Sequence, residues 1–235
     1  MGLAAAAALL ATSPAAAGSI EIAPTTIEVP ARAGTAVVYI TNHGDQAIVA
    51  QVQAYDWRQT DKGEQLDPST TLSISPPMAR VPPGQRQTIR LAITPDPGAT
   101  TERSFRLLIS ELPDPSGPAT LGVRVMLQFS VPVFAAGKQP RQAQLVWSLD
   151  RDAAGVTLTA RNDGTLHAKL VAPALITADG KRIAATPAGL AYILPGAAQR
   201  WTIPASDLRP GEDVHVSGRD DADGNALDAT LAIPR

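Results

Sequence analysis

The chain has 235 residues, of which 44% are hydrophobic, a net charge of −2 and no cysteine. This length holds one large or two ordinary domains, the apolar content excludes a disordered chain, and the lack of cysteine excludes disulfides, zinc–thiolate sites, iron–sulfur clusters and cysteine nucleophiles. Basic and acidic residues are balanced, 10 against 11 in residues 18–138 and again in residues 139–235, so a cationic face for nucleic acid is not expected.

The N-terminus carries a short apolar run, residues 3–17, that ends in small side chains. The run is too short to span a bilayer, and Ala15, Ala16 and Ala17 fit the small-x-small pattern of a signal-peptide cleavage site. We therefore expect residues 1–17 to be removed near Ala17 and the protein to be exported to a bacterial periplasm. An Ala-rich tail is the alternative, because no basic residue precedes the run.

The segment from residue 20 to 135 alternates apolar and polar side chains, which is the period of β-strands. Turns rich in Gly, Pro and Asp divide it, and no helical pattern intervenes. Pro24 interrupts the first predicted strand, as only an edge strand or a bulge tolerates. Seven strands are predicted, at residues 20–29, 35–41, 48–56, 72–75, 87–94, 104–112 and 124–134. Their number and spacing indicate an immunoglobulin-like β-sandwich.

A polar, Pro-containing linker at residues 135–142 separates this segment from a second one of similar character. Six strands are predicted there, at residues 144–149, 156–162, 170–177, 199–203, 214–217 and 227–233. We predict an all-β protein of two β-sandwich domains, an N-terminal one over residues 18–137 and a smaller C-terminal one over residues 138–235. The sequences of the two halves show no convincing repeat.

The residue types that carry catalysis or bind metals do not cluster in the sequence. His43, His167 and His215 lack metal-ligand spacing, and we expect them to be solvated or paired. An acidic run at residues 220–224 resembles a calcium loop but lacks its downstream Glu, so we interpret it as an acidic turn. No nucleophile elbow or phosphate-binding loop occurs. We expect no enzymatic activity, no cofactor and no metal.

The most informative segment is the last predicted strand of the first domain. Apolar side chains occupy every second position of it, at Val123, Val125, Leu127, Phe129, Val131 and Val133. Such a strand is either a core strand or a sheet edge that offers its backbone and apolar side chains to another chain. Both alternatives are open at this point.

Four segments in order resemble the PapD-like periplasmic chaperones of chaperone–usher pilus assembly. They are TAVVYITNHGD at residues 35–45, SPPMARVPPG with QTIRL at residues 75–84 and 87–91, ERSFRLLISELP at residues 102–113, and the alternating strand at residues 123–135. Residues 143–235 match the family only in length and β character.

The resemblance implies two immunoglobulin-like β-sandwiches arranged around a cleft, and a partner. In that family the last strand of the first domain completes the fold of a pilus subunit, which is then delivered to an outer-membrane usher. The side chains that fill the subunit groove are then Val123, Val125, Leu127, Phe129 and Val131. Each buried apolar side chain contributes about 1.5–3 kcal/mol.

The sequence departs from the family at the site that holds the subunit's terminal carboxylate. Thr26 and Pro132 stand where the family has an Arg and a Lys. Arg90, Arg106 and Arg124 are the candidate replacements, with Arg90 ranked first, although each also fits a solvated strand-face arginine.

Two other classes of protein remain as alternatives. A secreted structural sandwich, such as an adhesin or a pilus subunit, would have a free N-terminal strand, whereas residues 18–30 contain two prolines. A carbohydrate-binding or cofactor-binding sandwich module needs aromatic platforms, and aromatic residues make up only 4% of the chain.

Overall fold

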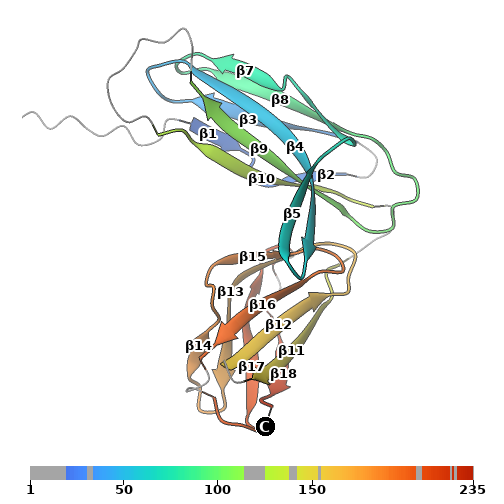
Figure 1. Cartoon of the computed structure of the whole chain (residues 1–235), viewed down its shortest axis with the longest axis vertical. Coiled ribbons are helices and arrows are strands. Elements are labelled where there is room, and N and C mark those ends of the chain that lie inside the picture. The colour runs from blue at the N-terminus through green and yellow to red at the C-terminus, as the bar shows by residue number, and fades with distance from the viewer. Residues whose placement is uncertain are drawn as a thin grey trace, which may run out of the picture.

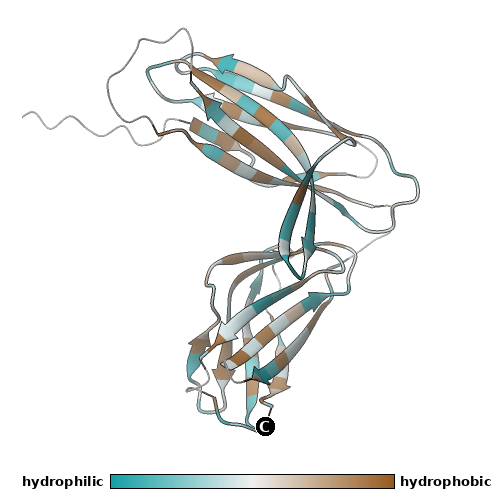
Figure 2. Ribbon diagram, in the orientation of Figure 1, coloured by the Kyte–Doolittle hydropathy of each residue, from teal (hydrophilic) through white to brown (hydrophobic). Residues whose placement is uncertain are grey.

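The structure is a computed structural model that describes residues 20–30, 34–113, 125–137, 142–152, 155–204, 208–222, 224 and 227–234. All regular elements in these ranges are β-strands, and they form two sandwiches that lie one above the other in Figure 1. Apolar and polar side chains alternate along most of the strands (Figure 2), as the period of the sequence predicts. The predicted signal segment, residues 1–17, lies outside the described residues.

The first sandwich packs a four-stranded sheet, in the order β1-β3-β8-β6, against a six-stranded one, in the order β2-β10-β9-β4-β5 with β7 also paired to β4. Val38, Ile89 and Leu107 are fully buried between the two sheets. The strands are β1 (Ile20–Ala23), β2 (Ile27–Val29), β3 (Thr35–Asn42), β4 (Ile48–Thr60), β5 (Gly63–Pro68), β6 (Leu72–Ser75), β7 (Met78–Val81), β8 (Arg86–Ile93), β9 (Arg103–Leu112) and β10 (Gln128–Ala135).

The first domain therefore has more strand segments than the seven predicted. Pro24 divides the predicted first strand into two, of which β1 pairs with β3 in one sheet and β2 pairs with β10 in the other. β5 was not predicted because Leu66 is its only large apolar residue, so it shows no alternation. β10 begins at Gln128, four residues later than the predicted strand.

The second sandwich packs the sheet β11-β12-β16 against the sheet β14-β13-β17-β18, in which β15 also pairs with β13. Leu158, Leu175 and Ile203 are fully buried between them. The strands are β11 (Leu145–Asp152), β12 (Gly155–Asn162), β13 (Ala168–Thr177), β14 (Arg182–Ala184), β15 (Leu190–Ile193), β16 (Ala198–Ile203), β17 (Asp213–Asp220) and β18 (Ala229–Ala232). β14 and β15 are additions to the six predicted strands.

The two domains share one turn that their sequences did not reveal as a repeat. Asn42 ends β3 and Asn162 ends β12, and both side chains are fully buried. Each amide group donates to two carbonyl oxygens, at 2.7 and 2.9 Å, and each side-chain oxygen accepts from a glycine N–H two residues later at 2.9 Å. The same side chain thus locks the equivalent turn in each sandwich.

An extended hairpin and the end of β10 join the two domains. β4 continues beyond the sheet to Thr60 and turns back as β5, which lies against the second domain in Figure 1. Trp57 of this hairpin and Phe134 of β10 belong to the apolar core of the second domain. The Gln59 side chain donates to the carbonyl oxygen of Tyr192 and accepts from the N–H of Leu194, both at 2.9 Å.

Candidate functional site

β10 has a partner along one edge and along only part of the other. β9 pairs with it from Gln128 to Ala135, whereas β2 pairs with it only from Val133 to Ala135. Within the described part of the chain, no strand pairs with the second edge of residues 128–132. An apolar strand of this kind therefore presents an open edge, which is the feature that allows another chain to add a strand.

The backbone of β10 shows which groups face this open edge. The carbonyl oxygen of Leu127 accepts from Glu111 of β9 at 2.8 Å, and the N–H of Ala136 donates to Val29 on the other side at 3.1 Å. Because successive residues of a strand point their backbone groups to opposite edges, the even-numbered residues face away from β9. Gln128 and Ser130 can therefore pair with an added strand. Pro132 faces the same edge without an N–H, so the open edge ends there.

The side chains of the predicted donor face differ in burial along the strand. Val125 is 74% exposed, Leu127 and Phe129 are half-buried, and Val131 is only 4% exposed. Val131 belongs to the core of the first sandwich, so the chaperone's own fold covers this predicted groove-filling residue. Val123 lies outside the described residues.

Arg106 lies across β10 from the open edge, at the level where that edge ends. It is the cross-strand partner of Pro132 on β9, and its side chain is 12% exposed. Its guanidinium group stacks on the Trp57 ring at 3.7 Å and approaches the Tyr192 ring at 5.6 Å. The Glu64 carboxylate lies 3.6 Å from Nη2. Burial lowers the pKa of Arg106, and the nearby Glu64 acts in the opposite direction.

Thr26 and Pro132, the two positions without the family's cations, meet at this same place. The Thr26 hydroxyl lies 3.4 Å from the hydroxyl of Tyr192, whose ring also faces Arg106. The structure thus brings Thr26, Pro132 and Arg106 together beside the second domain. Arg106 supplies a buried cation that neither of the other two can provide.

The other two candidate arginines are not part of this cluster. Arg90 is exposed on β8, between Val37 and Ser75 in the four-stranded sheet, and its neighbours Ile89 and Leu91 are buried. Its side chain therefore projects from the face of the first domain opposite to Arg106, so the candidate ranked first lies away from the cluster of Thr26, Pro132 and Arg106. Alternation in the sequence shows that the Arg90 side chain points out of the core. It does not show to which of the two sheets the strand belongs. Arg124 lies outside the described residues.

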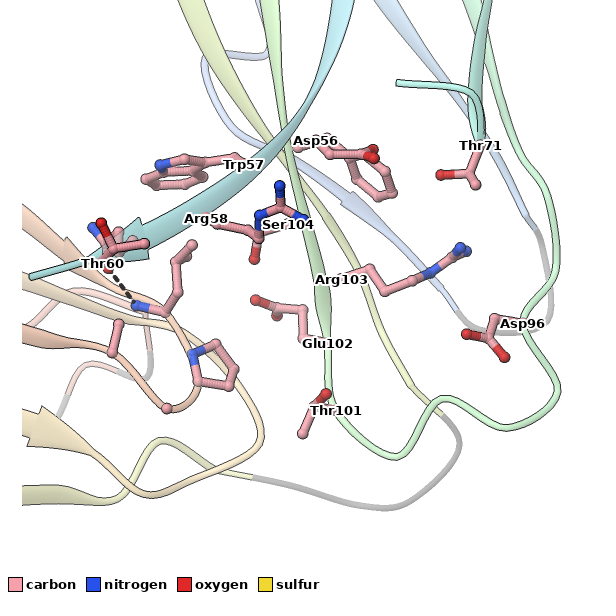
Figure 3. Close-up of a pocket in the computed structure, with 16 residues that line it drawn as sticks. Asp56, Trp57, Arg58, Thr60, Thr71, Asp96, Thr101, Glu102, Arg103 and Ser104 are labelled. Carbon is pink, nitrogen blue, oxygen red and sulfur yellow. Dashed lines mark hydrogen bonds between the residues drawn. The ribbon is translucent and has the colours of Figure 1, made fainter. Parts of the chain in front are cut away.

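A buried histidine–carboxylate contact joins the two domains near this cluster. The Nδ1 atom of His167 lies 2.9 Å from one Glu102 carboxylate oxygen and 3.1 Å from the other, and both side chains are almost fully buried. Glu102 also lines a cavity of about 600 Å³ between the hairpin and the second domain (Figure 3). In that view its side chain points away from Arg103, which extends toward Asp96.

The remaining histidines and acidic residues have ordinary structural roles. His43 pairs with Glu21 at 2.6 Å and His215 lies 3.7 Å from Asp228, both at the surface. In the acidic turn, the buried Asp220 accepts from the backbone N–H of Lys169 at 2.9 Å. Among the residues that the structure places, no group of three or more His, Asp or Glu side chains is arranged to hold a metal ion.

Two immunoglobulin-like sandwiches, the first ending in a strand with an open apolar edge, define the architecture of a two-domain pilus-assembly chaperone. The family model of pili and flagellar-assembly chaperones, PapD N-terminal domain, matches residues 19–141. The match covers more than half of the sequence, and the chain therefore belongs to the PapD-like pilus-assembly chaperone family. This is a family of periplasmic, non-enzymatic chaperones. No curated protein matches the sequence.

Solved structures share the fold over nearly the whole chain. The complex of CsuC with the tip adhesion subunit CsuE from Acinetobacter baumannii matches with a TM-score of 0.68 and 19% identity, covering 92% of this chain and 99% of that chain. The complex of the Salmonella enterica SafA pilin with the SafB chaperone gives 0.64 and 19%, over 93% and 98%. The Pseudomonas aeruginosa CupB2 chaperone gives 0.60 and 20%, over 91% and 100%. Within the described ranges, no helix has the length and apolar character to cross a membrane.

Proposed function

We propose that this protein binds pilus subunits in the periplasm through the open edge of β10 and delivers them to an outer-membrane usher. The observation that carries the proposal is the unpaired edge of β10, which ends at Pro132, the cross-strand partner of the mostly buried Arg106. Solved complexes of similar fold hold a chaperone with a pilin or a tip adhesin, which supports this class of partner.

A strand of the subunit pairs with the backbone of Gln128 and Ser130. The side chains that enter the subunit are those that the chaperone's own core leaves accessible. These are Val125, Leu127 and Phe129, with Val123 extending the series. At about 1.5–3 kcal/mol for each buried apolar side chain, three of them contribute several kcal/mol to binding. No nucleotide or other cofactor is needed, because folding of the subunit supplies the free energy.

Arg106 is the proposed anchor for the terminal carboxylate of the subunit. A carboxylate placed beside Pro132 lies within reach of the neighbouring guanidinium group, which is held in place by Trp57. A charge-assisted pair in a site screened from water is stronger than one at the surface. Arg124 is a second candidate, and Arg90 is not.

We also propose bounds for the signal peptide and for the two domains. Residues 1–17 are a signal peptide cleaved near Ala17, residues 18–137 form the strand-donating domain, and residues 138–235 form the second domain. β10, the last strand of the first sandwich, ends at Ala135, and β11, the first strand of the second sandwich, begins at Leu145. These bounds support a domain boundary between the two residues.

The test is co-purification of a pilus subunit, identified by mass spectrometry, with tagged chaperone from the periplasm. Arg106→Ala is expected to weaken the complex by about 1.5–3 kcal/mol, the range for hydrogen bonds to charged groups. Arg90→Ala is the matched control, since it removes the same side chain from the opposite face of the domain. Equal binding by wild type and Arg106→Ala, or an equal loss in both variants, would contradict the anchor.

A further inference from the structure

We propose that Glu64 occupies the carboxylate site of Arg106 in the free chaperone, so that an incoming terminal carboxylate must displace it. This inference rests on the proposed role of Arg106 as the anchor. It makes Glu64 an internal competitor that tunes how tightly a subunit terminus is held, and it assigns a task to the β4–β5 hairpin beyond contact with the second domain.

The fold brings the two charges to one face of the six-stranded sheet. Glu64 is the cross-strand partner of Gln59 in the hairpin, and Gln59 is tied to the second domain through both ends of its amide group. The hairpin is therefore fixed at that point, and Glu64 reaches across β4 to Arg106 on β9. Glu64 thus supplies a nearby negative charge to a guanidinium group that is 12% exposed.

The Glu64–Arg106 contact can be exchanged for a contact with another carboxylate, because it does not hold the Arg106 side chain in place. Arg106 is held by the face of Trp57 at 3.7 Å, so its position does not depend on the carboxylate. Glu64 makes a single long contact at 3.6 Å, and its side chain is 52% exposed. A carboxylate that lies half in water can rotate away at small cost, since an exposed ion pair contributes little net free energy. A terminal carboxylate delivered by an added strand then takes its place.

The experiment uses the full mature chain and the acetylated pentapeptide Thr-Val-Thr-Val-Tyr, prepared with a free terminal carboxylate or a terminal amide. Binding is followed by the NMR shift of the Arg106 side-chain Nε–H group, which detects weak complexes. Glu64→Gln is expected to tighten binding of the acid by up to about fivefold, because it removes a weakly held competing charge. Binding of the amide is expected to remain unchanged. Asp67→Asn is the matched control, because it removes one charge from the same hairpin at a residue paired with Arg58.

The outcomes separate the two proposals. If wild type prefers the acid and Glu64→Gln leaves that preference unchanged or weakens it, Glu64 does not compete, and Arg106 still stands as the anchor. If wild type and Glu64→Gln do not distinguish acid from amide, or do not bind either, the anchor fails and this inference fails with it. If Asp67→Asn tightens binding of the acid as much as Glu64→Gln does, the effect comes from the net charge of the hairpin. That result would also overturn the role of Glu64. Because the Arg106→Ala variant has no such Nε–H group, its binding is followed through the Trp57 indole N–H, and there Glu64→Gln is expected to have no effect.

Discussion

The imidazole ring of His167 lies flat against the phenyl ring of Phe134, with 3.5 Å between the ring centroids and 9° between the planes. Phe134 belongs to β10, the strand with the open edge, and His167 lies just before β13 of the second domain. Glu102 completes the contact, because its carboxylate accepts from both the ring and the backbone N–H of His167. These three residues form a latch that joins the second domain to β10.

Removal of the latch carboxylate is expected to destabilise the protein, whereas removal of a similar surface carboxylate is not. Glu102→Ala leaves the buried N–H groups of His167 without an acceptor, which costs about 1–3 kcal/mol. Glu21→Ala breaks the exposed pair with His43 and should cost less than about 1 kcal/mol. Guanidinium unfolding measures both values. Equal losses in the two variants would show that burial of the His167 pair contributes nothing.

Leu127, just before β10, and Val131 within it are two apolar residues that differ in burial. Leu127→Glu should leave the melting temperature nearly unchanged and abolish subunit binding, because the new charge would enter an apolar groove without a partner. Val131→Glu should unfold the first domain, since Val131 is a core residue. Thermal melts and co-purification of each variant distinguish the two effects. Unfolding of Leu127→Glu would mean that this residue serves the chaperone's own core.

The direction of the backbone groups can be tested with proline. Ser130→Pro removes an N–H that faces the open edge, so it should block strand addition while the chaperone stays folded. Phe129→Pro removes an N–H that faces β9 and should destabilise the first domain by about 1–3 kcal/mol, since a ladder hydrogen bond to β9 is lost. Urea unfolding and subunit binding are measured for both variants. If Ser130→Pro still binds a subunit as wild type does, the added strand does not use this edge.

The repeated asparagine turn predicts two equivalent losses of stability in different domains. Asn42→Ala and Asn162→Ala each remove hydrogen bonds to two carbonyl oxygens, one of which is buried, and to a glycine N–H. Each change should cost about 2–4 kcal/mol, because leaving a buried polar group unpaired costs about 1–3 kcal/mol. Hydrogen exchange by domain is the measurement. Loss of protection should be confined to the first domain for Asn42→Ala and to the second for Asn162→Ala.

The sequence by itself determined the all-β class, the presence of two sandwiches and the alternating apolar strand at the end of the first one. These follow from local signals, since side chains alternate with a period of two and Gly or Pro marks the turns. The interruption at Pro24 indicated an edge position as well, because a proline removes one ladder hydrogen bond wherever it lies. Alternation also placed Arg90 and Arg106 outside the core, as the structure has them.

Only the tertiary structure decided which of these side chains meet. Arg90 and Arg106 have the same local pattern, yet they project from opposite sheets, because strand pairing between distant segments sets the face. Val131 of β10 and Leu127 just before it have the same place in the alternation, but only Val131 belongs to the core of the first sandwich. The hairpin that places Glu64 beside Arg106 has almost no apolar signal, and its position depends on contacts with the second domain more than a hundred residues away. Such contacts are long-range, and no local period of the sequence encodes them.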